Sequence, residues 1–289
     1  MDNYLEKRKK EILKLLGIIG IDTRFISYTS NTIYINDQRF SKFSKKRQET
    51  FKKYYPEFEV ISSTIFQKIC ASVSKVLSEE LHPKYNVLLF KEKNQVDCLL
   101  KIVLEPYTRK YGIKIIESDL EYFDYNENND ENNDNNCEYN KTAIDSVLIS
   151  LTLDEEVKSI LSNVFSGNGI KTDKEKTYKK IKIIYPFINI SNDWINSFLN
   201  TKSIKTKEEF NSYNLNLNND LNNKKSEISG NNINNGNNGN SESKEKNKDS
   251  DIIAESFMGF LEEIIPQYKE NILKSSIFLE SHINKNNKL

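Results

Sequence analysis

Through the middle of this 289-residue chain, short apolar segments alternate with longer amphipathic ones. The short segments have the length of buried strands, and each is followed by apolar residues at helical spacing. Such alternation indicates a parallel sheet whose strands are joined by right-handed helical crossovers. The expected strands are residues 87–90, 113–117, 146–151 and 181–185, and the expected helices are residues 97–110, 154–165 and 192–199.

Further elements are expected on both sides of this region. Helical spacing runs over residues 5–16 and ends in the segment from Gly17 to Gly20, and residues 32–36 alternate like a short strand. An amphipathic helix is predicted over 61–81, before His82 and Pro83. Helical spacing returns over 252–265, is broken by Pro266, and is followed by a final helix.

Two polar segments interrupt the pattern. Residues 126–136 are only Asn, Asp and Glu, and residues 213–251 are dominated by Asn, Ser, Lys and Gly. Neither can bury enough apolar area to offset its ordering entropy, so both are predicted to be flexible insertions. We expect a basic α/β extension over 1–60, an α/β core over 61–200, an insertion over 201–251, and C-terminal helices over 252–285 that complete the core.

Charge and cysteine content limit the function classes. The chain has 42 basic and 42 acidic residues, so nucleic-acid binding requires a local basic patch. The three cysteines, Cys70, Cys98 and Cys137, form no CxxC or Cys–His pair, so no metal site and no disulfide framework are expected. No apolar run is long enough for a bilayer, and the start has no signal-peptide core. The sequence thus predicts a cytoplasmic protein without a membrane partner.

Ligands of open parallel sheets bind beyond the carboxyl ends of the strands. Here that edge would carry the loop 91–96 and the segment 152–156. The loop contains neither glycine nor serine, although close approach of backbone amides to a phosphate usually requires glycine.

Four segments in this order resemble the PP-loop ATP pyrophosphatases (adenine nucleotide α-hydrolases), and among them the tRNA 2-thiolation group. The first is the strand, loop and helix Val87-Leu-Leu-Phe-Lys-Glu-Lys-Asn-Gln-Val-Asp-Cys-Leu-Leu, and the second is residues 148–167, with Leu-Asp-Glu-Glu after a strand and Asn-Val-Phe-Ser-Gly at its end. The others are residues 182–195 and the helical tail 257–275. The resemblance implies a Rossmann-like α/β fold with a parallel sheet, a small N-terminal extension and disordered insertions.

The first segment departs from the family's phosphate loop. Where the family has Ser-Gly-Gly-x-Asp-Ser, this chain has no glycine or hydroxyl, and Glu92 adds negative charge. The nucleotide-loop remnant is Lys91, Glu92, Lys93, Asn94, Gln95, Val96 and Asp97. Two lysines and the N-terminus of the following helix leave room for weak ATP binding. We therefore expect no cofactor and no catalytic residue.

The second-motif remnant is Asp154 and Glu155. One interpretation is that these carboxylates, with Glu156, stabilise a helix N-terminus capped by Thr152. The other is that Asp154 faces a nucleotide crevice. Cys98, within a predicted helix, is expected to be a core residue rather than a nucleophile.

The extension contains a basic and aromatic run. The RNA-binding candidates are Lys42, Lys45, Lys46, Arg47, Lys52 and Lys53, interleaved with Phe40, Phe43, Phe51, Tyr54 and Tyr55. These residues either bind phosphates and unpaired bases, or form an amphipathic helix whose aromatics are core and whose lysines are solvated.

In the tRNA 2-thiolation group that this chain resembles, a catalytically active subunit pairs with a second subunit of the same fold that has lost its activity. The resemblance implies that this chain is such a second subunit. The sequence therefore predicts a chain without catalytic activity that binds tRNA and a catalytic PP-loop subunit during 2-thiolation of the wobble uridine. Two alternatives remain: an active ATP-dependent tRNA thiolase or adenylating enzyme with an atypical loop, and a protein-interaction scaffold without an RNA role.

Overall fold

The computed structural model describes residues 2–91, 94–118, 144–172, 177–178, 181–200 and 242–286. The chain divides into two compact units. Unit 1 comprises Met1–Glu156 and Asp173–Phe198, and unit 2 comprises Val157–Thr172 and Leu199–Leu289. The predicted insertion 126–136, most of the second insertion, Cys137, Glu92 and Lys93 lie outside the described residues.

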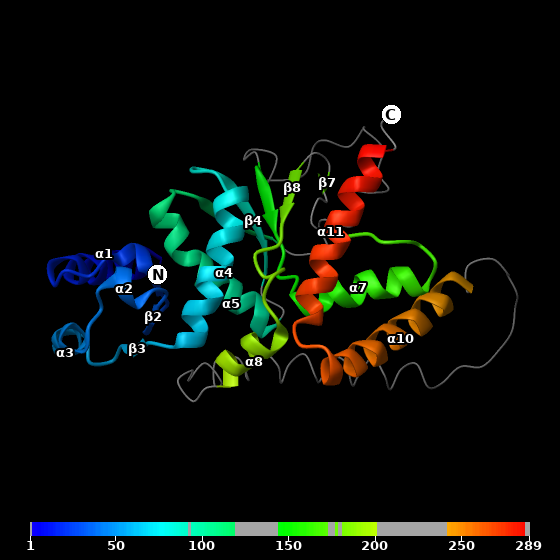
Figure 1. The fold of residues 1–289 in the computed structure, drawn as a ribbon. Helices are drawn as coiled ribbons and strands as arrows, with labels where there is room; N and C mark the ends of the chain where they lie inside the picture. The colour runs from blue at the N-terminus through cyan, green and yellow to red at the C-terminus, as the bar shows by residue number, and fades with distance from the viewer. Residues whose placement is uncertain are drawn as a thin grey trace, which may run out of the picture. The chain divides into compact units, whose positions relative to one another are not determined.

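Unit 1 begins with an N-terminal module, residues 2–61, drawn in blue in Figure 1. Its three-stranded sheet has the order β1-β2-β3, with an antiparallel β1–β2 pair and a parallel β2–β3 pair. The elements are α1 (Asp2–Ile18), η1 (Thr23–Phe25), β1 (Ile26–Tyr28), β2 (Thr32–Ile35), α2 (Gln38–Ser41), α3 (Lys45–Tyr54) and β3 (Glu59–Ile61).

An aromatic cluster forms much of the module's core. Phe43, Phe51 and Phe58 are at most 2% exposed and pack with Ile12 and Leu16 of α1. The Phe51 ring lies 6.2 Å from that of Phe43 and 5.9 Å from that of Phe58, both edge-on. The module therefore has a hydrophobic core of its own.

The rest of unit 1 is built on a second sheet of order β5-β4-β6-β8-β7. The first four strands are parallel neighbours, whereas β7 pairs with β8 antiparallel. This confirms the predicted α/β class and the four predicted strands. The elements are α4 (Thr64–Glu80), β4 (Asn86–Phe90), α5 (Gln95–Lys110), β5 (Lys114–Ser118), β6 (Ser146–Leu148), α7 (Leu153–Phe165), β7 (Thr177–Tyr178), β8 (Ile181–Ile184) and α8 (Asn192–Asn200).

Some boundaries differ from the prediction. Ile61 ends β3 rather than beginning a helix, because Ser63 caps α4 by accepting a hydrogen bond from the Phe66 amide at 3.3 Å. Strand β6 ends at Leu148 rather than at 151, where the chain turns toward α7. The two- and three-residue strands β1, β3 and β7 were not predicted, since they are too short to show alternation.

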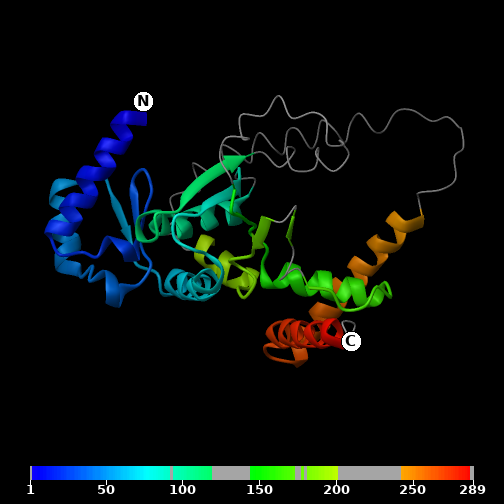
Figure 2. The same cartoon turned by 90° about the horizontal axis from the view of Figure 1, so that it is seen from above.

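Unit 2 contains the later part of α7, with α10 (Glu242–Ile264) and α11 (Tyr268–Asn286). Lys158 Nζ lies 2.9 Å from Glu255 Oε2, and Ser162 Oγ donates to Asp251 Oδ1 at 2.6 Å, so α7 runs beside α10 (Figure 2). The prediction that the C-terminal helices complete the α/β core stays a prediction.

The predicted insertion ends too late in the sequence. Helix α10 begins at Glu242, so residues 242–251 are helical rather than part of a flexible segment. Composition explains the difference, because these residues contain no glycine and place Glu and Lys three or four positions apart. No helix in the described ranges is both long and apolar enough to cross a membrane.

Candidate functional site

The five-stranded sheet has a point at which its strand order reverses. Strand β4 lies between β5 and β6. The chain runs from β4 to β5 on one side of β4, and β6 and then β8 lie on its other side. The connections after β4 and β6 therefore leave in opposite directions, which is where ligands bind in open α/β sheets. Since β4 and β6 are parallel, the loop after Phe90 and the segment after Leu148 lie at one edge, as predicted.

The start of α5 at this edge is capped by a side chain of the chain itself. Asn94 is extended, and its Oδ1 accepts hydrogen bonds from the amides of Val96 and Asp97 at 2.8 and 2.9 Å. Asparagine is among the best N-caps, and an anion at a helix N-terminus would use these same donors. Two of the amides on which weak ATP binding at this helix N-terminus would depend are therefore already bonded to Asn94.

Two further hydrogen bonds join the segments that follow neighbouring strands at this edge of the sheet. Ser150, from the segment after β6, donates through its Oγ to Asp97 Oδ1, and the Lys91 amide donates to the Ser118 carbonyl at 2.9 Å. The first contact joins the two sides of the reversal point. The Asp97 carboxylate lies in the first turn of α5, where its negative charge would oppose an anion bound at this helix N-terminus.

The second-motif carboxylates cap helices. The Thr152 hydroxyl and amide donate to Glu155 Oε2 at 3.1 and 2.9 Å, and the Glu155 amide donates back to Thr152 Oγ1 at 3.4 Å. This is a capping box at the start of α7. Asp154 Oδ2 accepts from the Asn192 amide at 2.8 Å, at the start of α8. The helix-capping interpretation accounts for both carboxylates.

Five RNA-binding candidates are exposed and form what we call the α3 lysine patch: Lys42, Lys45, Lys46, Lys52 and Lys53. Arg47 differs, because it is half-buried and donates through Nη1 to the Lys42 carbonyl at 2.7 Å. Its guanidinium also fills the space beside Gly20, where an added Cβ would lie 2.9 Å from Nη2. Arg47 therefore supports the module's structure.

The aromatic residues interleaved with these lysines also divide into buried and exposed groups. Phe43 and Phe51 are core residues, and Tyr55 packs on Phe51 with ring centroids 5.4 Å apart. Phe40 and Tyr54 are 51% and 67% exposed. The amphipathic-helix interpretation thus explains the buried aromatics, while two rings remain available at the surface.

We expect that Lys45→Gln combined with Lys46→Gln weakens tRNA binding and flattens its log–log salt dependence by about 0.7 per lost phosphate contact. Filter binding over a series of salt concentrations measures both quantities. Lys114→Gln, at an exposed lysine of β5, is the control for charge. An unchanged slope in the double variant would place the RNA surface elsewhere.

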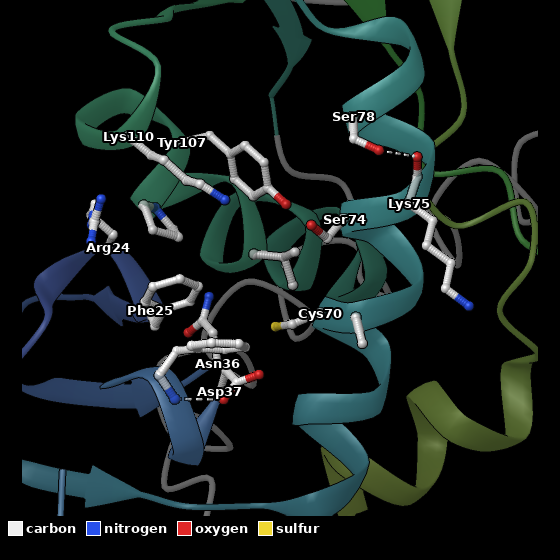
Figure 3. Close-up of a pocket in the computed structure, with 14 residues that line it drawn as sticks. Arg24, Phe25, Asn36, Asp37, Cys70, Ser74, Lys75, Ser78, Tyr107 and Lys110 are labelled. Carbon is white, nitrogen blue, oxygen red and sulfur yellow. Dashed lines mark hydrogen bonds between the residues drawn. The ribbon is translucent and has the colours of Figure 1, made fainter. Parts of the chain in front are cut away.

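A cavity of about 360 Å³ lies between the N-terminal module and helices α4 and α5 (Figure 3). Phe25 and Phe40 line it from the module, Cys70 and Ser74 from α4, and Tyr107 from α5. Its basic lining residues are Arg24, Lys75 and Lys110. Apart from Phe40, sequence reasoning missed this group, although the dipeptide Arg-Phe at 24–25 and again at 39–40 was a usable signal.

The surroundings of this cavity shift the pKa values of Tyr107, Cys70 and Asp22. Burial raises the pKa of Tyr107 to about 12. Burial also raises the pKa of the Cys70 thiol, which makes it an unreactive lining group. The hydrogen bond from Arg24 lowers the pKa of Asp22, whose carboxylate accepts from Arg24 Nη2 at 2.7 Å.

Within the described part of the chain, Cys98, His82 and His282 do not form a site. Cys98 is buried in α5, as expected, and His82 and His282 are exposed. Across the described residues, no three His, Cys, Asp or Glu side chains are grouped so that they could hold a metal ion.

Comparisons with known proteins give one remote match. No family model and no curated protein matches the chain. Among solved structures, it is similar to the U34-tRNA thiolase NcsA from Methanococcus maripaludis with its [4Fe-4S] cluster, at 14% identity over 75% of this chain and 79% of that one, with a TM-score of 0.43. A likeness this distant assigns neither a family nor a function, and no group of described residues here fits such a cluster.

Proposed function

We propose that this chain is a catalytically degenerate PP-loop protein that serves as a partner subunit in 2-thiolation of the tRNA wobble uridine. It resembles the second subunit of that system, of the cytoplasmic tRNA 2-thiolation protein 2 type. Its role is to bind tRNA and a catalytic PP-loop subunit, without turning over ATP itself.

The observation that carries the degenerate role is the cap on α5. An active phosphate loop directs backbone amides at the nucleotide, whereas here Asn94 Oδ1 accepts from two of those amides. Asp97 adds a carboxylate and is held across the reversal point by Ser150. Rearranging this edge for a triphosphate would break three hydrogen bonds and bring like charges together.

Sequence order and sheet topology support the PP-loop part of the proposal. The segments that resemble the family's first two motifs begin with β4 and β6, the strands that flank the reversal point. The third begins on β8, the next parallel strand. Exposed lysines on α3 and the basic cavity of the module support an RNA-binding role.

One observation favours the scaffold alternative. Helix α10 exposes an apolar row at helical spacing, with Ile253, Phe257, Phe260 and Ile264 between 38% and 57% exposed. Exposed apolar patches often mark protein–protein contacts. A scaffold without an RNA role would retain such contacts and show no affinity for tRNA.

The proposal predicts that cells lacking this chain lose 2-thiouridine at the wobble position of their tRNA, and that the wild-type gene restores it. Mass spectrometry of hydrolysed tRNA measures the modified nucleoside. Because the chain performs no chemistry, Lys91→Ala, at the start of the loop, should restore the modification as well as wild type does.

An α3 lysine patch variant, Lys45→Gln with Lys46→Gln, is the matched comparison in the same cells, and it should restore less. Unchanged 2-thiouridine in the deletion would contradict the proposal. Failure of Lys91→Ala alone to rescue, with normal protein levels, would favour the active enzyme.

A further inference from the structure

The cavity between the N-terminal module and helices α4 and α5 has an aromatic wall. Phe25 and Phe40 stack with centroids 5.2 Å apart and planes at 27°. The guanidinium of Arg24 lies 5.9 Å from the Phe25 centroid, and that of Arg39 lies 5.6 Å from the Phe40 centroid. Phe40 is 51% exposed, so part of its ring remains accessible to a planar ligand.

Positive charge surrounds this wall. Lys110 Nζ lies 5.5 Å from the Phe25 centroid and 5.0 Å from the Tyr111 centroid. Among the residues that the structure describes, neither Lys110 nor Lys75 is ion-paired with a carboxylate. Asp37 is the one acidic residue of the lining, and its Oδ1 accepts from the Phe40 amide at 2.9 Å. Arg24 is paired with Asp22, whose Oδ2 lies 2.7 Å from Arg24 Nη2, so Lys75 and Lys110 are the lining cations that no described carboxylate neutralises. The excess of these two lysines over Asp37 favours an anionic ligand.

Neutral hydrogen-bonding groups complete the lining. Asn36 is buried, and its Oδ1 accepts from Ser27 Oγ at 3.0 Å, which leaves its amide nitrogen as a donor. Figure 3 shows the Tyr107 hydroxyl near Ser74 and the Lys110 ammonium group. With its pKa raised to about 12, the Tyr107 phenol keeps its proton at neutral pH. A volume of about 360 Å³ lies within the range of small-ligand sites.

We propose that this cavity binds one phosphorylated nucleoside, with the base stacked on Phe40 and the phosphate near Lys110 and Arg24. Its favoured source is an unpaired nucleotide of RNA, and in that form the inference rests on the proposed tRNA-binding function. The free nucleotide has the same chemistry and is the other source.

The combination of groups selects this class of ligand. An accessible aromatic ring stacks on any base at about 1–3 kcal/mol per base, whereas a purely apolar ligand would leave the two lysines and the Asn36 donor without partners. A simple inorganic anion would not use the Phe25–Phe40 stack. Base-paired RNA would not fit, because its bases cannot enter a cavity of this kind.

The test uses the full chain with four probes: tRNA, labelled single-stranded oligouridine, an RNA duplex of equal length to the oligouridine, and free UMP. Anisotropy reports the RNA affinities, and calorimetry reports binding of UMP. We expect Phe40→Leu to weaken oligouridine binding about five-fold or more, with little change for the duplex. Lys110→Gln should flatten the salt slope by about 0.7.

Two controls match these variants. Phe278→Leu removes an exposed ring of α11, which lies outside the proposed RNA-binding surface, and Lys114→Gln removes an exposed lysine of β5; neither should reproduce the effects. Circular dichroism confirms folding, which Phe40→Leu should preserve because the ring is half exposed.

The possible results distinguish failure of the proposed nucleotide site from failure of the proposed tRNA-binding function. Oligouridine and tRNA binding that persists unchanged in Phe40→Leu overturns the cavity site and leaves the tRNA role intact. UMP binding that depends on Phe40, without any RNA binding, supports the site for a free nucleotide and overturns the tRNA role. Absence of binding to all four probes overturns both.

Discussion

Replacing Arg109 by methionine should lower the free energy of unfolding by about 2–4 kcal/mol. The guanidinium is 18% exposed and is paired with Glu105, one turn away on α5. Its Nη2 also donates to the carbonyls of Thr23 and Ile26 at 2.9 and 2.8 Å. Methionine would leave these carbonyls without that donor, so the loss should exceed that of a surface ion pair.

Glu105 reinforces the same contact between the module and α5. Its Oε2 accepts from the Tyr28 amide at 3.0 Å, and Oε1 lies 2.8 Å from Lys9 Nζ. Because Lys9 remains in the variant, Glu105 stays partly neutralised, which keeps the expected loss below that of a fully orphaned buried charge. The N-terminal module is thus fixed to α5 by charged and backbone groups together.

Urea denaturation followed by circular dichroism measures the change. Lys101→Met is the matched control, because Lys101 pairs with Glu117 at 2.8 Å on α5 and β5, but both side chains are more than 40% exposed. That pair should contribute less than about 1 kcal/mol. Equal losses in the two variants would show that the Arg109 contacts add no more than a surface pair.

The sequence was sufficient for the sheet and the site edge. The strand at 87–90 is a continuous apolar run, the strand at 181–185 is apolar except for Lys182, and helical spacing follows each of them. The strand order, and with it the reversal point, was not predicted, because strand–helix alternation does not determine which strands are neighbours. The capping box from Thr152 to Glu155 was also readable, because its residues are three positions apart.

Other features depend on contacts between distant residues. Arg47 looked like its lysine neighbours, but its role comes from Gly20 and Lys42, which only the folded module brings together. The cavity joins residues 24–40 to helices α4 and α5, so no local pattern could reveal it. Asn94 lay within the loop considered, yet its role as a cap required the extended backbone seen in the structure.

The affinity of the chain for ATP should be weaker than about 1 mM, which corresponds to a binding free energy of about −4 kcal/mol. A loop that cradles phosphate with backbone amides would reach the micromolar range, an affinity about a thousand-fold higher. The cap from Asn94 and the Asp97 carboxylate both oppose binding at this edge. Removing the Asn94 cap should therefore strengthen ATP binding.

A variant of residues 92–94 tests whether the loop and its cap are what weaken ATP binding. Glu92→Gly and Lys93→Gly combined with Asn94→Gly would restore backbone access and release the amides of Val96 and Asp97. ATP affinity should rise in this variant if the rest of the crevice accepts a nucleotide. Gln95→Gly, next to the capped amides, changes backbone freedom without removing the cap and is the control.

The most direct measurement is a calorimetric titration of the purified full chain with Mg–ATP, with pyrophosphate release followed in the same sample. A degenerate partner subunit should give no saturable heat below about 1 mM ATP and no pyrophosphate above background. Micromolar ATP affinity, or pyrophosphate released by the chain alone, would contradict this account and identify an active enzyme.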